Sequence, residues 1–166
     1  MNLIDTHTHL YVEEFDDDQQ AVIDAALRND ITRFYIPSID SRYTQRMHDL
    51  KTAYPENVYL MAGLHPTSVD EDYKNELVHV SDRLEKEMPC AVGEIGIDLY
   101  WEQKYQSQQV DAFRYQIRLA KAYQLPIVIH CRAAFDEVFE VLEEENDEAL
   151  YGIFHCFTGN QAQAEQ

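Results

Sequence analysis

The sequence has few of the features that mark secreted or membrane proteins. Only three of its 166 residues are cysteines, Cys90, Cys131 and Cys156, and none form a C-x-x-C pair. A set this sparse argues against a disulfide framework and suits a reducing compartment. The chain also lacks an apolar run of about 18 residues and a basic, apolar leader. We therefore expect a soluble cytoplasmic protein that does not contact membranes.

Basic residues, glycine and proline are also scarce. Lys and Arg together number 13 against 31 Asp and Glu, giving a formal net charge of −18. This balance excludes a protein that holds nucleic acid over a broad basic surface, although a small site could still use the charge of bound metal ions. Glycine and proline number five each, and no linker rich in Pro, Gly or Ser divides the chain. We therefore expect a single domain over 1–166.

Short apolar segments alternate with longer segments of helical periodicity. Strands are expected at 3–7, 32–37, 58–65, 91–95, 127–130 and 150–155. Helices are expected at 18–29, 41–54, 72–88, 103–124 and 135–145. Such alternation is typical of parallel βαβ units and predicts an α/β fold.

The spacing of these segments favours a barrel. The strands recur about every 30 residues, the usual length of a βα unit, and eight such units would need roughly 240 residues. Asn160 and Gln163 also resemble the capping box of a helix that starts just before the sequence stops. We expect a (β/α)8 TIM barrel of which about six of eight units are present, so that the domain is C-terminally incomplete. A smaller six-stranded domain is the alternative.

Four histidines and one glutamate stand where the predicted strands end. Side chains two apart on a strand point the same way, so His7 and His9 would converge on one point. Glu94 lies in an otherwise apolar segment, where an unpaired carboxylate is costly to bury. His130 and His155 follow the fifth and sixth apolar runs. Because strand ends meet at one face of a barrel, these side chains would share one cavity suited to a divalent metal.

Other residues at the same face have open roles. His65 would contact substrate or brace its loop. Arg132 would hold an anionic group or form a salt bridge, and Asp98 is open in a similar way. Tyr100 and Trp101 would stack on a base or cover the site as a loop.

Five segments resemble, in order, the motifs of TatD-type metal-dependent deoxyribonucleases, amidohydrolase-like hydrolases with a TIM barrel. They are Asp5-Thr6-His7-Thr8-His9, Gly63-Leu64-His65-Pro66, Gly93-Glu94-Ile95-Gly96-Ile97-Asp98, His130-Cys131-Arg132 and His155-Cys156-Phe157-Thr158-Gly159. The resemblance implies one or two divalent ions, Zn, Mn or Mg, held by His7, His9, Glu94, His130 and His155. It also implies an additional acidic ligand that this sequence does not contain.

The resemblance predicts a hydrolase that cleaves phosphodiester bonds of DNA through a metal-activated water, with catalytic roles for Glu94, His65 and Arg132. DNA would be bound locally at the metal site, and no stable protein partner is predicted. One alternative is an amidohydrolase acting on amides, lactones or cyclic C–N bonds. Many such enzymes bridge their metals with a modified lysine on strand four, whereas Glu94 stands here. The other alternative is a non-catalytic metal-binding protein.

The charge balance predicts weak, local DNA binding. With a net charge of −18, few phosphates can be neutralised outside a metal site. A plot of log affinity against log salt concentration should therefore have a shallow slope, equivalent to about one to three phosphate contacts. Titration of an oligonucleotide at several salt concentrations measures this slope, and a steep dependence would contradict a metal-centred mode of binding.

Overall fold

The computed structural model describes residues 2–166, in which strands and helices alternate regularly. The strands are β1 (Leu3–Asp5), β2 (Ile31–Ile36), β3 (Val58–Leu60), β4 (Val92–Asp98), β5 (Ile127–Arg132) and β6 (Gly152–Phe154). The α-helices are α1 (Gln19–Arg28), α2 (Thr44–Ala53), α3 (Tyr73–Glu87), α4 (Gln106–Tyr123), α5 (Phe135–Glu145) and α6 (Gln161–Glu165). Short 3-10 helices are η1 (Glu13–Phe15), η2 (Ser41–Tyr43) and η3 (Pro66–Ser68). The predicted α/β class is confirmed.

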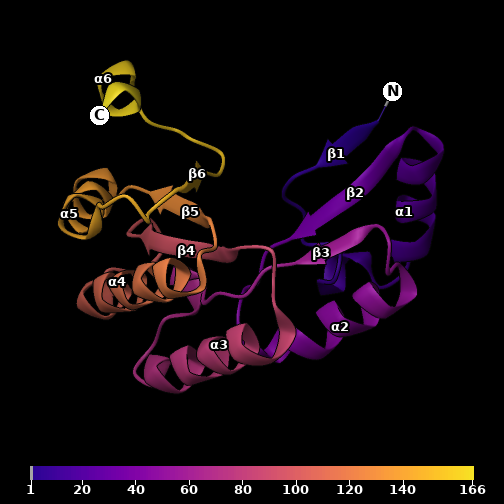
Figure 1. Cartoon of the computed structure of the whole chain (residues 1–166), viewed down its shortest axis with the longest axis horizontal. Helices are drawn as coiled ribbons and strands as arrows, with labels where there is room; N and C mark the ends of the chain where they lie inside the picture. Colours follow the sequence, from indigo (N-terminus) through magenta and orange to yellow (C-terminus); the bar gives the residue numbers. More distant parts are fainter. Residues whose placement is uncertain (1) are drawn as a thin grey trace.

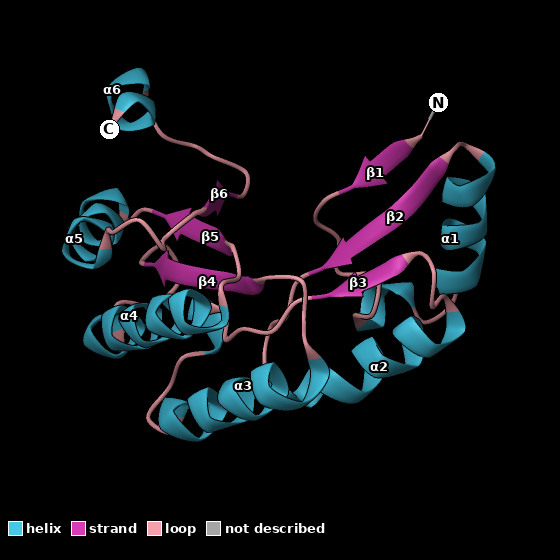
Figure 2. Ribbon diagram, in the orientation of Figure 1, coloured by secondary structure: helices cyan, strands magenta, loops and turns pink. Residues whose placement is uncertain are grey.

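The strands form two parallel three-stranded sheets, in the orders β1-β2-β3 and β4-β5-β6. The two sheets meet at a parallel bridge between Ala62 and Val92, where Gly93 N also donates to Ala62 O at 2.9 Å. Figure 1 shows the strands as an arc with β1 and β6 at its two ends, and Figure 2 shows helices along its outside. Within residues 2–166 the arc does not close, so the eight-unit barrel stays a prediction.

Each sheet has its own hydrophobic core beneath the helices. Residues from β2, α1 and α2 form one cluster, with Phe34, Ile23 and Met47 almost fully buried. A larger cluster combines β4 and β5 with α3, α4 and α5, and includes Ile95 and Phe113. Because both cores lie between strands and helices, the strand ends remain available for polar side chains.

Several strand boundaries differ from the sequence-based expectation, and three of the differences concern the polar residues. Strand β3 ends at Leu60 instead of 65, so His65 lies in the segment that follows the strand. Strand β1 ends at Asp5, so His7 and His9 lie in the loop that follows and strand alternation does not orient them. Strand β4 continues to Asp98 instead of stopping at 95, so Glu94 lies inside the strand and not near its end. The extension follows from pairing with β5, whose register continues to Asp98 and Arg132.

Strand β5 approaches β4 closely at Gly96. This glycine has φ +142°, and a Cβ built on it would lie 1.9 Å from the carbonyl oxygen of His130. A side chain at this position would therefore displace His130. Gly96 thus allows the backbone of β5 to come close.

Two buried glutamines of α4 hold the backbone near the strand ends. Gln109 accepts from Asp98 N at 2.8 Å and donates to Asp98 O at 3.1 Å. Gln116, two turns further on, accepts from Leu64 N at 2.7 Å and donates to Leu64 O at 3.2 Å. These amides satisfy backbone groups that pairing between strands leaves free. They attach the segments carrying Asp98 and His65 to the outer helix.

The final helix, α6, begins with the predicted capping box. The Asn160 side chain accepts from Gln163 N at 3.0 Å, and the Gln163 side chain accepts from Asn160 N at 2.8 Å. This prediction is confirmed. Across residues 2–166, every helix is too short or too polar to cross a lipid bilayer.

Replacing Gln116 by leucine should lower the free energy of unfolding by about 1–3 kcal/mol, because the buried N–H and C=O of Leu64 lose their partner. Urea denaturation measures the change. Gln106→Leu, at the exposed first turn of the same helix, is the matched control and should stay within about 0.5 kcal/mol. Equal stability of both variants would show that the buried amide has no structural role.

Candidate metal centre

A cavity of about 860 Å³ lies where the strands end. Its walls come from loops after β1, β3 and β6 and from strands β4 and β5. The lining includes His7, His9, His65, Glu94, His130, Arg132 and His155. Residues spread over most of the sequence therefore come together in one cavity, as predicted from their places at the strand ends.

Glu94 is the acidic centre of this cavity and is 2% exposed. Its Oε2 lies 3.1 Å from His7 Nε2 and 3.6 Å from His9 Nε2, and its Oε1 lies 3.2 Å from His130 Nδ1. Burial by itself raises the pKa of Glu94, but the surrounding imidazoles, first of all that of His130, outweigh it and hold that pKa well below the usual range. Glu94 is therefore a buried anion at neutral pH.

The spacing of the donor atoms suits a divalent ion. Donor atoms of His7, His9 and Glu94 all lie within 4.8 Å of one another, and the same holds for His65, Glu94 and His130. Both ring nitrogens of His7 are buried and have no hydrogen-bond partner among residues 2–166, since the approach of Nε2 to Glu94 lacks hydrogen-bond geometry. An unpaired buried polar atom costs about 1–3 kcal/mol, which a cation held by Nε2 would offset. Imidazole and carboxylate groups are also suitable ligands for such an ion.

His130 and His155 extend the cluster in different ways. The Nε2 of His130 lies 2.8 Å from Asp98 Oδ2, and this carboxylate together with Glu94 raises the pKa of His130 against the lowering effect of burial. His155 stacks on His7 with 3.3 Å between ring centroids, and burial lowers the pKa of His155. His155 thus lines the cavity beside His7 but belongs to neither group with ligand spacing.

Asp98 was left without a role at the level of sequence. Besides contacting His130, it accepts from the backbone N–H of Tyr100 at 3.0 Å through Oδ1. The signal that could have assigned it is its position four residues after Glu94, because side chains at even spacing on a strand share one face. The strand expected from the sequence ended at 95, so Asp98 was not recognised as lying on the same strand face as Glu94.

His65 has two different hydrogen-bonding sides. Its Nδ1 accepts from Thr67 N at 3.2 Å and so caps η3, which is the bracing role considered from the sequence. Burial lowers the pKa of His65 to about 4, so the ring is neutral at neutral pH. With Nδ1 accepting, the single ring proton lies on Nε2, 3.7 Å from Glu94 Oε2. His65 therefore presents an N–H donor to the cavity, which disfavours it as a ligand despite its spacing.

Within the described residues 2–166, Arg132 has no acidic partner at salt-bridge distance, so the salt bridge considered from the sequence is absent there. Its guanidinium lies over the Tyr100 ring at 3.8 Å and 5.1 Å from the Trp101 ring centroid. Tyr100 is 57% exposed and Trp101 69% exposed, so these two rings do not cover the cavity as a buried loop would. The result is an exposed aromatic pair that contacts Arg132, which lines the histidine cavity, while Trp101 itself lines a second, neighbouring cavity.

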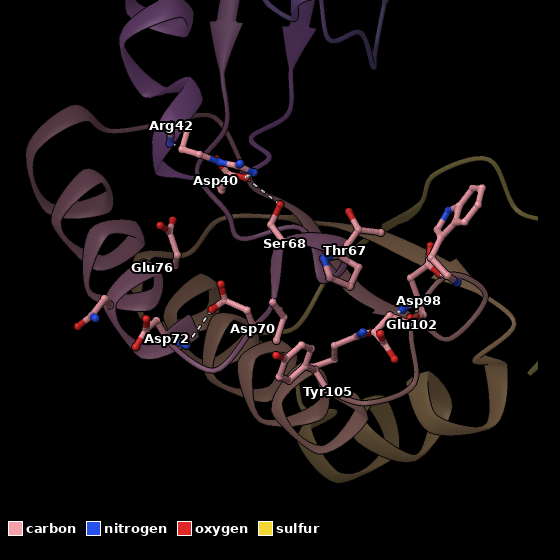
Figure 3. Close-up of a pocket in the computed structure, with 15 residues that line it drawn as sticks. Asp40, Arg42, Thr67, Ser68, Asp70, Asp72, Glu76, Asp98, Glu102 and Tyr105 are labelled. Carbon is pink, nitrogen blue, oxygen red and sulfur yellow. Dashed lines mark hydrogen bonds and ion pairs between the residues drawn. The ribbon is translucent and has the colours of Figure 1, made fainter.

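A neighbouring cavity of about 590 Å³ is lined by several acidic side chains instead of histidines (Figure 3). Asp98 contributes to this cavity, and the Asp40 carboxylate in it is held by Arg42 at 2.7 Å and Ser68 at 2.8 Å. The carboxylates that line it are Asp40, Asp70, Asp72, Glu76, Asp98 and Glu102. So many acidic groups would repel an anion, whereas the histidine-lined cavity also contains the cation of Arg132.

The family model described as TatD related DNase matches residues 4–166. The chain belongs to this family. Over 164 residues it is 35% identical to an uncharacterized metal-dependent hydrolase, YabD, of Bacillus subtilis (strain 168), covering 99% of this chain and 64% of that protein. Over 160 residues it is 29% identical to a 3'-5' ssDNA/RNA exonuclease TatD of Pantoea ananatis (strain LMG 20103), covering 96% and 61%. The chain thus spans less than two thirds of the length of these family members.

Solved structures agree with the family assignment. The crystal structure of YJJV, a TatD homolog from Escherichia coli K12, superposes with a TM-score of 0.88 at 29% identity, covering 98% of this chain and 63% of that one. A TatD family hydrolase from Entamoeba histolytica superposes with a TM-score of 0.81 at 22% identity and supports the fold alone. The arc of six parallel strands is therefore an arrangement found within family structures.

Proposed function

We propose that this chain provides the metal-binding site of a hydrolase that cleaves phosphodiester bonds in DNA. The observation that carries the proposal is the buried, negatively charged Glu94, surrounded by imidazoles in an open cavity. The residues that would hold one or two divalent ions, Zn, Mn or Mg, are His7, His9, Glu94, His130 and His155. When bound, such ions supply an activated water and positive charge for phosphate oxygens.

Glu94 is suited to serve two ion positions. Its Oε2 faces His7 and His9, whereas its Oε1 faces His130, so its two oxygens serve different sets of donors. The depressed pKa keeps this carboxylate charged when protons compete for it. A neutral amide of the same shape would provide weaker coordination on both sides.

His65 and Arg132 would act on the substrate. His65 Nε2–H points toward Glu94 and could donate to a phosphate oxygen held beside it. The Arg132 guanidinium lines the cavity and carries a permanent positive charge. It is not paired with Glu94, so that charge is free to face a substrate. A strongly acidic chain would otherwise repel a polyanion, so these two donors would define where the phosphate enters.

Two observations favour nucleic acid as the substrate. Family members include proteins named as exonucleases of single-stranded DNA and RNA. In this chain, the exposed rings of Tyr100 and Trp101 contact Arg132 of the cavity lining and offer surfaces on which an unpaired base could stack. Among residues 2–166, the cavity is lined by the carboxylate of Glu94 and by no lysine. This lining gives less support to an amidohydrolase that bridges its metals with a modified lysine.

Glu94→Gln should weaken divalent metal binding by at least about tenfold and abolish metal-dependent hydrolysis of a single-stranded oligonucleotide, because the amide lacks the charge that the ions require. Isothermal titration with Zn²⁺ and Mn²⁺ measures the affinity. Glu140→Gln on the exposed side of α5 is the matched control and should bind as the unaltered chain does. Unchanged metal affinity in Glu94→Gln would refute the site. Metal binding without turnover by the unaltered chain would favour the non-catalytic alternative.

Trp101 is the sole tryptophan of the chain, so its fluorescence reports directly on the aromatic surface that contacts Arg132. With metal present and phosphorothioate linkages to slow hydrolysis, a short single-stranded oligonucleotide should quench this fluorescence more than a blunt duplex does. Trp101→Ala should reduce affinity, measured by anisotropy of a labelled oligonucleotide, by about 1–3 kcal/mol. Tyr151→Ala is the control, because Tyr151 is an exposed aromatic beside Ile127 at the start of β5, whereas Trp101 contacts Arg132 at its end. Equal affinity of an abasic oligomer would contradict base stacking.

A further inference from the structure

Tyr11 lies in the loop after β1, two residues beyond His9, and is fully buried. Its ring packs in the core of the first sheet, and its backbone carbonyl accepts a hydrogen bond from Arg46 Nε. It also contacts the ring of Tyr43 at 5.4 Å between centroids. Because both the backbone and the packed ring of Tyr11 are fixed by these contacts, its hydroxyl has a defined position.

The hydroxyl of Tyr11 takes part in two hydrogen bonds whose directions can be assigned. It lies 2.8 Å from the carbonyl oxygen of Pro37 and 3.0 Å from His9 Nδ1. A carbonyl oxygen can only accept, so the single phenolic proton of Tyr11 points to Pro37. The phenolic oxygen is then the acceptor toward His9, and the proton between them belongs to His9 Nδ1.

The consequence appears at the other ring nitrogen of His9. A neutral imidazole carries one ring proton, so a proton on Nδ1 leaves a lone pair on Nε2. That nitrogen lies 3.6 Å from Glu94 Oε2, inside a group of donor atoms with metal-ligand spacing. If Nε2 carried the proton instead, it could not bind a cation.

We propose that Tyr11 is a positioning residue that holds His9 in the Nδ1–H tautomer and thereby keeps His9 Nε2 free to bind a divalent cation. The inference rests on the proposed metal site, but its first step concerns the chain without metal. His65 provides an internal contrast, because a backbone N–H donates to its Nδ1 and places the proton on Nε2. Two imidazoles in the same cavity are thus set in opposite tautomers by what contacts their Nδ1 atoms.

The first test is ¹⁵N nuclear magnetic resonance of the imidazole nitrogens in the metal-free chain at a pH where both rings are neutral. His9 signals are assigned by their absence in His9→Gln, and His65 signals by their absence in His65→Gln. We expect a protonated Nδ1 in His9 and a protonated Nε2 in His65. A His9 ring that carries its proton on Nε2 would overturn the proposal, whatever the metal site does.

The second test uses Tyr11→Phe, which retains the ring in the core and removes only the hydroxyl. The fraction of His9 with a protonated Nδ1 should fall, and Zn²⁺ affinity should fall about 10- to 100-fold, as is usual when a partner of a metal-binding imidazole is lost. Tyr73→Phe is the matched control, since Tyr73 is also buried and its hydroxyl bonds Asp111 at 2.7 Å. That variant should leave both measurements unchanged.

The two tests separate the inference from the proposed function. If Glu94→Gln weakens Zn²⁺ binding but folded Tyr11→Phe does not, the metal site stands and the role of Tyr11 is refuted. If neither variant changes the affinity, the proposed metal site itself fails. Should Tyr11→Phe not fold, the tautomer of His9 in the unaltered chain still decides, because that measurement needs no substitution at Tyr11.

Discussion

The burial of Glu94 is the constraint on which the rest of the site depends. A carboxylate with 2% exposure is costly unless charge or hydrogen bonds compensate it. Here the compensation comes from imidazoles carried by the loops after β1 and β3 and by strand β5. Each of those segments must therefore stay in register with β4, and the hydrophobic cores and the α4 glutamines on the outside serve that requirement.

The imidazoles around Glu94 are chemically different because each has a different second contact. His130 lies against the Asp98 carboxylate, which favours a charged ring. His65 accepts from a backbone N–H and stays neutral, whereas His9 contacts the hydroxyl of Tyr11. All of these residues are histidines, so residue type alone does not tell a metal ligand from a hydrogen-bond donor. The distinction comes from the atom that contacts the ring nitrogen facing away from Glu94.

Much of the fold could be predicted from the sequence because apolar periodicity and strand length are local properties. The helix at 135–145 was predicted with its observed bounds, and the capping box at Asn160 was also found. Strand ends were less accurate. The prediction for β4 stopped at 95, although pairing with β5 carries it to Asp98, and that pairing is a long-range property. Similarly, His7 and His9 were assigned to a strand that ends at Asp5.

The sequence by itself determined the α/β class and the set of polar side chains that gather in one cavity, since both follow from which residue types stand after which apolar segment. It also provided the motifs that resemble the family to which the chain belongs. Only the tertiary structure decided what each polar group does. Tyr11 illustrates the reason, because its hydroxyl acts through Pro37, 26 positions away, and no local pattern encodes such a contact. Proton positions in the site depend on these distant partners, so they become visible only when the chain is folded.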